Sequence, residues 1–413
     1  MTTASPGSPA ALDAAAAPLF GSGGPGDASA ERMLATVHAL AADRFTGRRV
    51  GTPGGRAAAE WLAGRLAELG AVVEVDEFAV SGVRELQATP VLSYRDTLLV
   101  HRRDFAEQLT STELPTPVTG QLATAEARSW RARWLLVPAA DQETVSRAEA
   151  EDAIGLLVPR GVDDEGWMPK MIAGPPTGLV PILSVRTDLH AELSNGLGEI
   201  AGSVPMRTIR TTGRNVYGVF SAPSPGGLSV LLTAHYDGVG DDPEVRLPAA
   251  ADNASGVAVV LEAARLLAGS LPSGTGLAVA LLDGEEAGAR GSAHHAPQVA
   301  AGTYVVNVDG AAQLGEAAAV EAGGPAEPLL AALDQAGRQT GVPLRAGAMA
   351  SDNRRYAAAG LPSIGIGMGM PGYQTPAETP DRVEPRTLLA AAALVVATVE
   401  HLTKSPVKLG ETR

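Results

Sequence analysis

The middle of the chain contains, in order, LSVLLTAHYDG (228–238), LPAAADNASG (247–256), LAVALLDGEEAG (277–288) and TYVVNVDG (303–310). Each apolar run is short, rich in Val, Leu and Ala, and bounded by Gly or polar residues, which predicts buried strands of a mostly parallel sheet. Open sheets of this kind bind ligands beyond the carboxyl ends of their strands. At such ends lie His235, Asp237, Glu285, Glu286 and Asp309. The stretch therefore predicts a metal-centred hydrolytic site.

The composition indicates an acidic globular protein with more than one compact unit. The chain has 413 residues, of which 45% are apolar, a net charge of −14 and a pI near 5.0. This charge argues against nucleic acid or an anionic membrane as the main partner. The chain has no cysteine, which excludes thiolate catalysis, Cys-zinc sites and disulfides.

The amino-terminal segment and the final helix bear on the location of the protein. Residues 1–20 lack a basic region followed by a strong apolar run, so we expect no secretory signal and a cytoplasmic protein. A secreted form that has already been trimmed is the alternative. The apolar segment 388–399 is shorter than the roughly 20 residues that span a bilayer, so no membrane anchor is expected. The sequence does not indicate the oligomeric state.

Changes in sequence pattern divide the chain. Residues 1–28 are rich in Ala, Gly, Pro and Ser, which predicts a disordered arm, and 406–413 form a tail. Helices are predicted at 29–41 and 52–70, followed by an edge strand at 71–80. Residues 100–206 contain short strand-like pieces separated by Pro and Gly, which predicts an inserted β-rich domain. The insert either shapes access to the site or is a surface addition.

The remainder, 29–99 and 207–405, is predicted to form one discontinuous catalytic domain. After Asp309 the pattern predicts helices at 326–341, 352–360 and 385–404, with a strand at 361–369. Alternating strands and helices build a doubly wound α/β sheet with helices on both sides.

The candidate ligands suit zinc, which takes nitrogen from His and oxygen from Asp or Glu. His235 and Asp309 can supply one metal, and Asp237 can hold the imidazole through its second nitrogen. Asp252 precedes a helical pattern, where an ordinary role would be an N-cap. Its position between the other acidic residues favours a carboxylate that bridges two metals.

Glu285 and Glu286 are adjacent after a predicted strand, so their side chains point in different directions. One can ligate metal while the other faces the substrate water as general base. His294 and His295 follow at the start of a predicted helix and are interpreted as helix-surface residues rather than ligands.

These motifs together resemble the di-zinc aminopeptidases of the aminopeptidase Y and bacterial aminopeptidase S type, relatives of glutamate carboxypeptidase and glutaminyl cyclase. The matching pieces, in addition to AHYDG and VNVDG, are ADNASGVAVVLEAARLL, EEAGARGS, AAAGLPSIGI and YQTPAETPDRV. The resemblance extends from about residue 30 over nearly the whole chain. It also implies that the insert is similar to a protease-associated domain.

The resemblance implies a role for each matching residue. His235 and Asp309 would bind one zinc, Asp252 would bridge, and Glu286 would bind the second zinc, with Glu285 as the general base. Tyr373 occupies the place of a tyrosine that stabilises the oxyanion.

One departure from the family concerns the last zinc ligand. The family has His where this chain has Gln374, which weakens or removes a ligand of the second zinc. Smaller departures are Asn353, where the family often has His, and Glu378, where Asp is commoner.

Three functions remain open on the sequence. The first is a zinc aminopeptidase that removes an N-terminal residue from a peptide. The second is a single-metal relative acting on a specialised amide by hydrolysis, aminoacyl transfer or cyclisation, which Gln374 favours. The third is a non-catalytic homologue, for which Glu285 would have no purpose.

Overall fold

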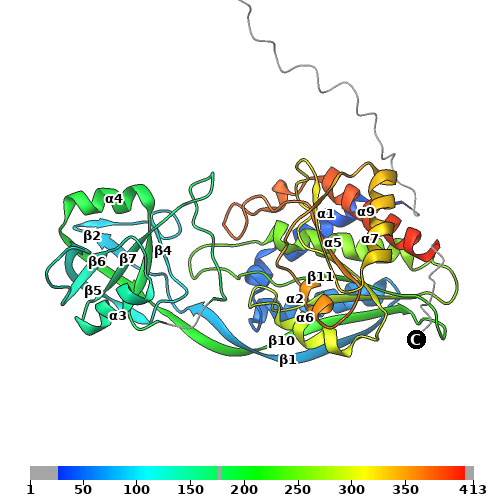
Figure 1. The fold of residues 1–413 in the computed structure, drawn as a ribbon, viewed down its shortest axis with the longest axis horizontal. Helices are drawn as coiled ribbons and strands as arrows, with labels where there is room; N and C mark the ends of the chain where they lie inside the picture. The colour runs from blue at the N-terminus through cyan, green and yellow to red at the C-terminus, as the bar shows by residue number, and fades with distance from the viewer. Residues whose placement is uncertain (1–26, 175–177, 405–413) are drawn as a thin grey trace, which may run out of the picture.

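The computed structural model describes residues 27–174 and 178–404. Two lobes make up this part of the chain, each built on its own eight-stranded sheet (Figure 1). Almost all of the predicted arm 1–28, and the predicted tail 406–413, lie outside the described residues.

The first sheet has the order β1-β10-β12-β11-β13-β16-β14-β15. Its four central strands, from β12 to β16, are parallel, and antiparallel pairs flank them on both sides. The bounds along the sheet are β1 Val72–Leu86, β10 Met206–Ser221, β12 Gly276–Leu282, β11 Ser229–His235, β13 Tyr304–Val308, β16 Ser363–Gly367, β14 Ala318–Gly323 and β15 Leu344–Ala346. The predicted α/β class is confirmed, although β14 and β15 had not been anticipated.

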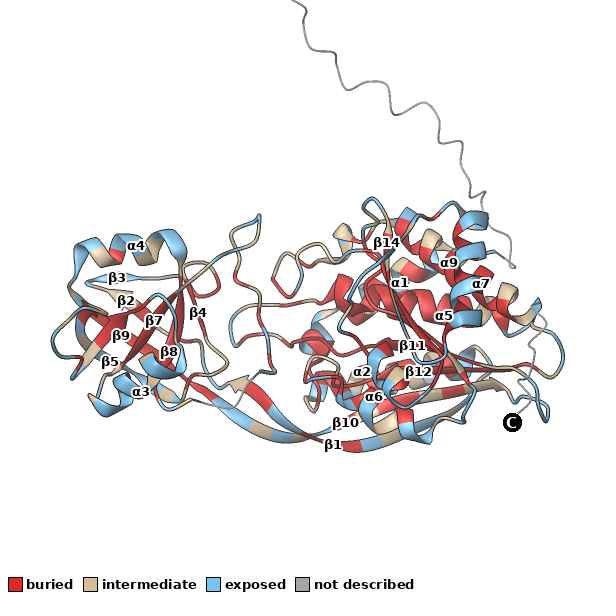
Figure 2. Cartoon of the chain, in the orientation of Figure 1, coloured by how far each residue is buried: buried red, intermediate tan, exposed pale blue. Residues whose placement is uncertain are grey.

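Burial on both faces explains why the central strands are continuously apolar (Figure 2). In β11, Val230 and Leu232 pack into the main core, whereas Leu231 between them packs into a separate cluster on the other face. Successive strand residues point to opposite faces, so a strand covered on both sides needs apolar residues throughout.

Helices cover both faces of this sheet (Figure 1). The main core contains side chains of α1 Ala30–Leu40, α2 Pro53–Glu68, α5 Gly256–Leu267, α7 Glu327–Thr340 and α9 Pro385–Lys404. The other face is covered near α6 Arg290–His295 and α8 Asn353–Ala358, where Tyr356 is fully buried. By length and hydropathy alone, α9 could cross a membrane, but over half of its apolar window is buried against this core.

The sheet of the second lobe has the strand order β3-β2-β9-β5-β6-β7-β8-β4. Its bounds are β2 Leu92–Tyr94, β3 Thr97–Leu98, β4 Phe105–Glu107, β5 Leu114–Thr124, β6 Arg133–Leu136, α3 Gln142–Ala150, β7 Gly155–Arg160, β8 Ile182–Arg186, α4 Thr187–Gly196 and β9 Glu199–Val204. The predicted start of the insert at residue 100 is wrong, because β2 pairs with β9. Three-residue strands such as β2 are too short to produce a recognisable period. The likeness of this lobe to a protease-associated domain stays a prediction.

Two connections join the lobes. We call the lobe built on the first sheet the catalytic lobe, because it corresponds to the predicted catalytic domain. The first connection is the long antiparallel ribbon of β1 and β10, which runs from this sheet into the second lobe (Figure 1). The second is the segment 161–173, which leaves β7 and returns to the catalytic lobe, where the backbone N–H of Lys170 donates to the carbonyl of Gln374 at 3.0 Å. The insert therefore reaches the predicted site.

A buried ion network fixes this second connection. Asp242 of the catalytic lobe lies 2.7 Å from Nε of Arg102 and 3.0 Å from Nζ of Lys170, both from the second lobe. Arg102 also pairs with Glu107, which in turn bonds His101. The turn 101–105 folds His101 back onto β4, which brings it into this acidic cluster.

Candidate metal centre

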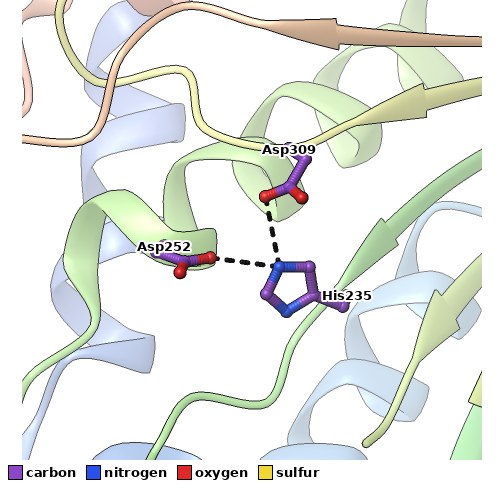
Figure 3. Close-up of side chains that lie close together, drawn as sticks. All are labelled: His235, Asp252 and Asp309. Carbon is purple, nitrogen blue, oxygen red and sulfur yellow. Dashed lines mark hydrogen bonds and ion pairs between the residues drawn. The ribbon is translucent and has the colours of Figure 1, made fainter. Parts of the chain in front are cut away.

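Three predicted ligands converge at the carboxyl ends of β11 and β13. Nε2 of His235 lies 3.1 Å from Oδ1 of Asp252 and 3.2 Å from Oδ1 of Asp309 (Figure 3). All three side chains are buried, and one ligand atom from each lies within 4.8 Å of the others. Among the described residues, this is the single group of His, Cys, Asp and Glu side chains with such geometry.

The hydrogen bonds of His235 identify which nitrogen faces the site. Nδ1 lies 3.1 Å from the carbonyl oxygen of Asp237, which can only accept, so Nδ1 is the donor. Nε2 then faces two carboxylates, and carboxylate oxygens are acceptors. A positive charge shared by the three groups, either a proton on Nε2 or a metal ion, satisfies all of them. Burial opposes a charged imidazole, but Asp309, Asp237 and Asp252 together raise the pKa of His235 well above its usual value. The three residues fit a zinc ion.

Asp252 is placed by the turn that leads into α5. Asn253 beside it donates to the carbonyl of Val308 at 2.9 Å and accepts from the N–H of Gly310 at 3.0 Å, which ties the turn to the end of β13. Gly256 permits this approach, because a Cβ there would lie 2.7 Å from the carbonyl oxygen of Val308. The helix is capped without Asp252, since the side chain of Asn253 accepts from the N–H of Gly256. The N-cap alternative for Asp252 is therefore disfavoured.

Asp237 is fully buried and has a second contact that its sequence position did not indicate. Its carboxylate lies 3.5 Å from Nδ1 of His235, farther than its own carbonyl oxygen. The same carboxylate accepts from the backbone N–H groups of Glu285 at 3.0 Å and Glu286 at 3.2 Å. Asp237 therefore fixes the turn that presents both glutamates.

Both glutamates line an open pocket. Glu286 also accepts a 2.6 Å hydrogen bond from the amide nitrogen of Gln374. Burial, followed by neighbouring carboxylates, raises the pKa of Glu286 well above its usual value. Burial also raises the pKa of Glu285, and His235 only partly offsets this.

Gln374 lies where the last zinc ligand was expected. Its amide nitrogen contacts Glu286 directly, so a neutral donor takes the place beside this carboxylate that a cation would fill. Oε1 of Glu286 and Oε1 of Gln374 are buried without a hydrogen-bond partner. These two free oxygens form an oxygen-only donor set, which is a poor match for zinc in comparison with an imidazole.

Two buried residues that sequence reasoning had given no role support this arrangement. Glu378 accepts from the N–H of Asp252 at 2.6 Å and from the N–H of Gln374 at 2.7 Å, so it joins the two halves of the site. Arg48 donates to the carbonyls of Tyr236 and Ala249, both at 2.7 Å, from beneath the site. Burial lowers the pKa of Arg48 to about 10. The sequence could not predict these contacts, because a single Arg or Glu in a loop carries no pattern that indicates which distant backbone group it binds.

A pocket of about 540 Å³ opens beside these groups. Glu285, Glu286, Tyr373 and Gln374 line it, and the hydroxyl of Tyr373 stays protonated because burial raises its pKa. Met171 and Ala173 of the second lobe form another part of the wall. The insert thus shapes access to the site, which was one of the two roles considered for it.

His294 and His295 do not join the metal group. His294 bonds Asp76 on β1 at 2.8 Å, and His295 lies 2.9 Å from the hydroxyl of Tyr356. Asn353, at a position where the family often has His, donates to Glu321 at 3.4 Å. These residues are therefore structural.

The site lies in the part of the chain that matches a known family. Residues 215–399 match the model of peptidase family M28. This match, over just under half of the chain, agrees with the family and the metallopeptidase class predicted from the motifs. No curated protein sequence matches the chain significantly.

Solved structures share the fold over nearly the whole described chain. A zinc aminopeptidase from Bacillus subtilis superposes with a TM-score of 0.72 at 21% identity, covering 92% of this chain and 97% of its own. An aminopeptidase from Aneurinibacillus sp. strain AM-1 gives 0.69 at 19% identity, covering 91% and 94%. A peptidase M28 precursor from Shewanella amazonensis gives 0.64 at 20% identity, covering 93% and 98%. At these identities the likeness concerns the fold, including the presence of both lobes.

Proposed function

We propose that this chain, whose residues 215–399 match the model of peptidase family M28, is a zinc-dependent aminopeptidase that removes the N-terminal residue of a short peptide. The observation that supports this most directly is the convergence of His235, Asp252 and Asp309 next to Glu285 at the wall of an open pocket. A bound zinc ion polarises a carbonyl oxygen and lowers the pKa of water.

The residues of the chain divide the remaining work. Hydrolysis breaks the amide C–N bond, adds the hydroxyl of water to the carbonyl carbon and leaves the proton on the departing amine. Glu285 takes that proton from water and returns it to the nitrogen. The protonated hydroxyl of Tyr373 donates to the oxyanion that forms on the carbonyl oxygen.

Chelation of the metal provides the first test. Zinc-loaded protein is expected to hydrolyse aminoacyl p-nitroanilides, to lose that turnover in a chelator, and to recover it when zinc is returned. The reason is that polarisation of the carbonyl and activation of water both depend on the bound zinc ion. Release of p-nitroaniline measures the rate, and elemental analysis measures the metal. Turnover that survives with no metal bound would contradict a zinc-dependent reaction.

A second candidate is a single-metal enzyme acting on a specialised amide. The hydrogen bond from Gln374 to Glu286 favours it, because this contact satisfies Glu286 without a second metal. We therefore expect about one firmly held zinc per chain, against about two where the second position has an imidazole.

Gln374→His is expected to raise the zinc content after gel filtration by about one ion per chain, since it restores the nitrogen ligand. Elemental analysis checks this, with Gln142→His on the exposed face of α3 as the matched control. If the added zinc leaves anilide turnover unchanged, the aminopeptidase proposal loses its main support and the specialised amide gains. If no zinc is gained, Gln374 does not occupy a metal position.

A further inference from the structure

The pocket is lined by side chains of both charges. Glu285 and Glu286 follow β12, whereas Arg354 and Arg355 belong to α8. Acidic side chains attract the ammonium group of a free amino terminus and repel a carboxylate. Any anionic group of a bound substrate is therefore favoured beside the arginines.

The two arginines differ in their partners. Arg354 forms an ion pair with Glu321 at 2.9 Å, so its charge is already balanced. Arg355 donates through Nη2 to the carbonyl oxygen of Gly288 at 2.9 Å. Within residues 27–174 and 178–404, no carboxylate forms an ion pair with Arg355. Four of the five N–H donors of its guanidinium group are left for another acceptor.

The contact with Gly288 places this cation close to the reacting groups. Gly288 belongs to the same turn as Glu285, since its N–H donates to the carbonyl of Glu285 at 2.8 Å. The ends of such a turn are less than about 7 Å apart between Cα atoms, which is about two residues of extended chain. A carboxylate one or two residues beyond the cleaved bond would therefore reach Arg355.

The part of the wall that comes from the second lobe restricts what else can enter. Met171 is half exposed and lines the pocket with Ala173, both held there by the contacts of Lys170 with the catalytic lobe. Their surface is apolar and offers no charge. The pocket volume of about 540 Å³ suits a small ligand rather than a long chain.

We propose that Arg355 binds the C-terminal carboxylate of the substrate, so that the enzyme prefers di- and tripeptides with a free carboxylate over longer or amidated peptides. This inference rests on the proposed peptidase function and names its substrate class. A guanidinium group binds a carboxylate through two parallel hydrogen bonds, which gives both affinity and orientation.

Binding to a zinc-loaded Glu285→Gln protein tests this without turnover. Calorimetry would compare Leu-Leu and Ala-Leu with their C-terminal amides. We expect the free peptides to bind about 10- to 100-fold more tightly than the amides, as a charged hydrogen-bond pair provides. Adding Arg355→Gln should reduce this preference to about one, Arg355→Lys should keep part of it, and Arg338→Gln on the exposed face of α7 should keep all of it.

Equal binding of peptide and amide, absence of peptide binding, or a preference that survives Arg355→Gln would each overturn the proposal. Hydrolysis of leucine p-nitroanilide, which has no carboxylate, separates this outcome from failure of the proposed function. If the Glu285→Gln protein that retains Arg355 shows no preference while the wild-type enzyme hydrolyses the anilide, the role of Arg355 alone is rejected. Absent anilide turnover with an intact preference rejects the aminopeptidase and keeps the carboxylate site.

Discussion

Glu285→Gln is expected to lower kcat for aminoacyl anilides by about 10²- to 10⁴-fold, the usual contribution of a general base. The amide of Gln cannot accept a proton from water, yet it preserves the size of the side chain. The backbone N–H of residue 285 keeps its 3.0 Å bond to Asp237, so the turn and Glu286 should stay in place. Steady-state kinetics at saturating zinc provide the measurement.

Three further measurements separate a lost base from a damaged site. Zinc content and KM should stay near the wild-type values, and Glu285→Asp should recover part of the rate because it restores a carboxylate at a greater distance. Glu316→Gln, on the surface, is the matched control and should leave kcat unchanged. A Glu285→Gln enzyme with wild-type kcat would exclude Glu285 as the base.

The strand ends are what the sequence predicts best. His235 and Asp309 end runs whose apolar composition is required by burial on both faces of the sheet, so their meeting at one edge follows from the parallel pairing of β11 and β13. Asp252 follows from its place before an amphipathic helix. For these residues, a local pattern and the general geometry of α/β sheets are sufficient.

The rest of the site depends on contacts between segments that are distant in the sequence. Glu378 joins the backbone of Asp252 to that of Gln374, and Met171 comes from a different lobe. Neither contact leaves a periodic pattern, because each requires only one side chain in an irregular loop. The motif at 373–375 could show that a histidine is replaced. It could not show that the replacement donates a hydrogen bond to Glu286.

Asp242→Ala is expected to destabilise the contact between the lobes by about 3–5 kcal/mol, the usual cost of removing one partner from a buried ion pair. The carboxylate of Asp242 is buried with Arg102 and Lys170, and their charges would remain without it. Urea unfolding and hydrogen exchange of the segment 165–173 would measure the effect. Asp188→Ala, which breaks an exposed pair with Arg186, is the control and should cost less than about 1 kcal/mol.

The dependence on pH distinguishes this ion pair from a simple packing defect. Burial tends to raise the pKa of Asp242, but Lys170 and Arg102 outweigh it, so the folded-state pKa lies below the ordinary value. The stabilisation is then fully present above the unfolded pKa of about 4 and is lost as the pH falls through the folded pKa. The difference between wild type and Asp242→Ala should therefore shrink in acid.

A second substitution identifies the origin of the cost. Adding Lys170→Met to Asp242→Ala removes one stranded charge and should recover part of the lost stability, whereas a packing defect would become worse. The same double variant loses the bonds of Nζ to the carbonyls of Gly240 and Asp241. These bonds hold the segment that places Met171 over the pocket, so the KM for peptides should rise even where stability returns. Recovery of both quantities together would mean that the network stabilises the lobes without positioning the pocket wall.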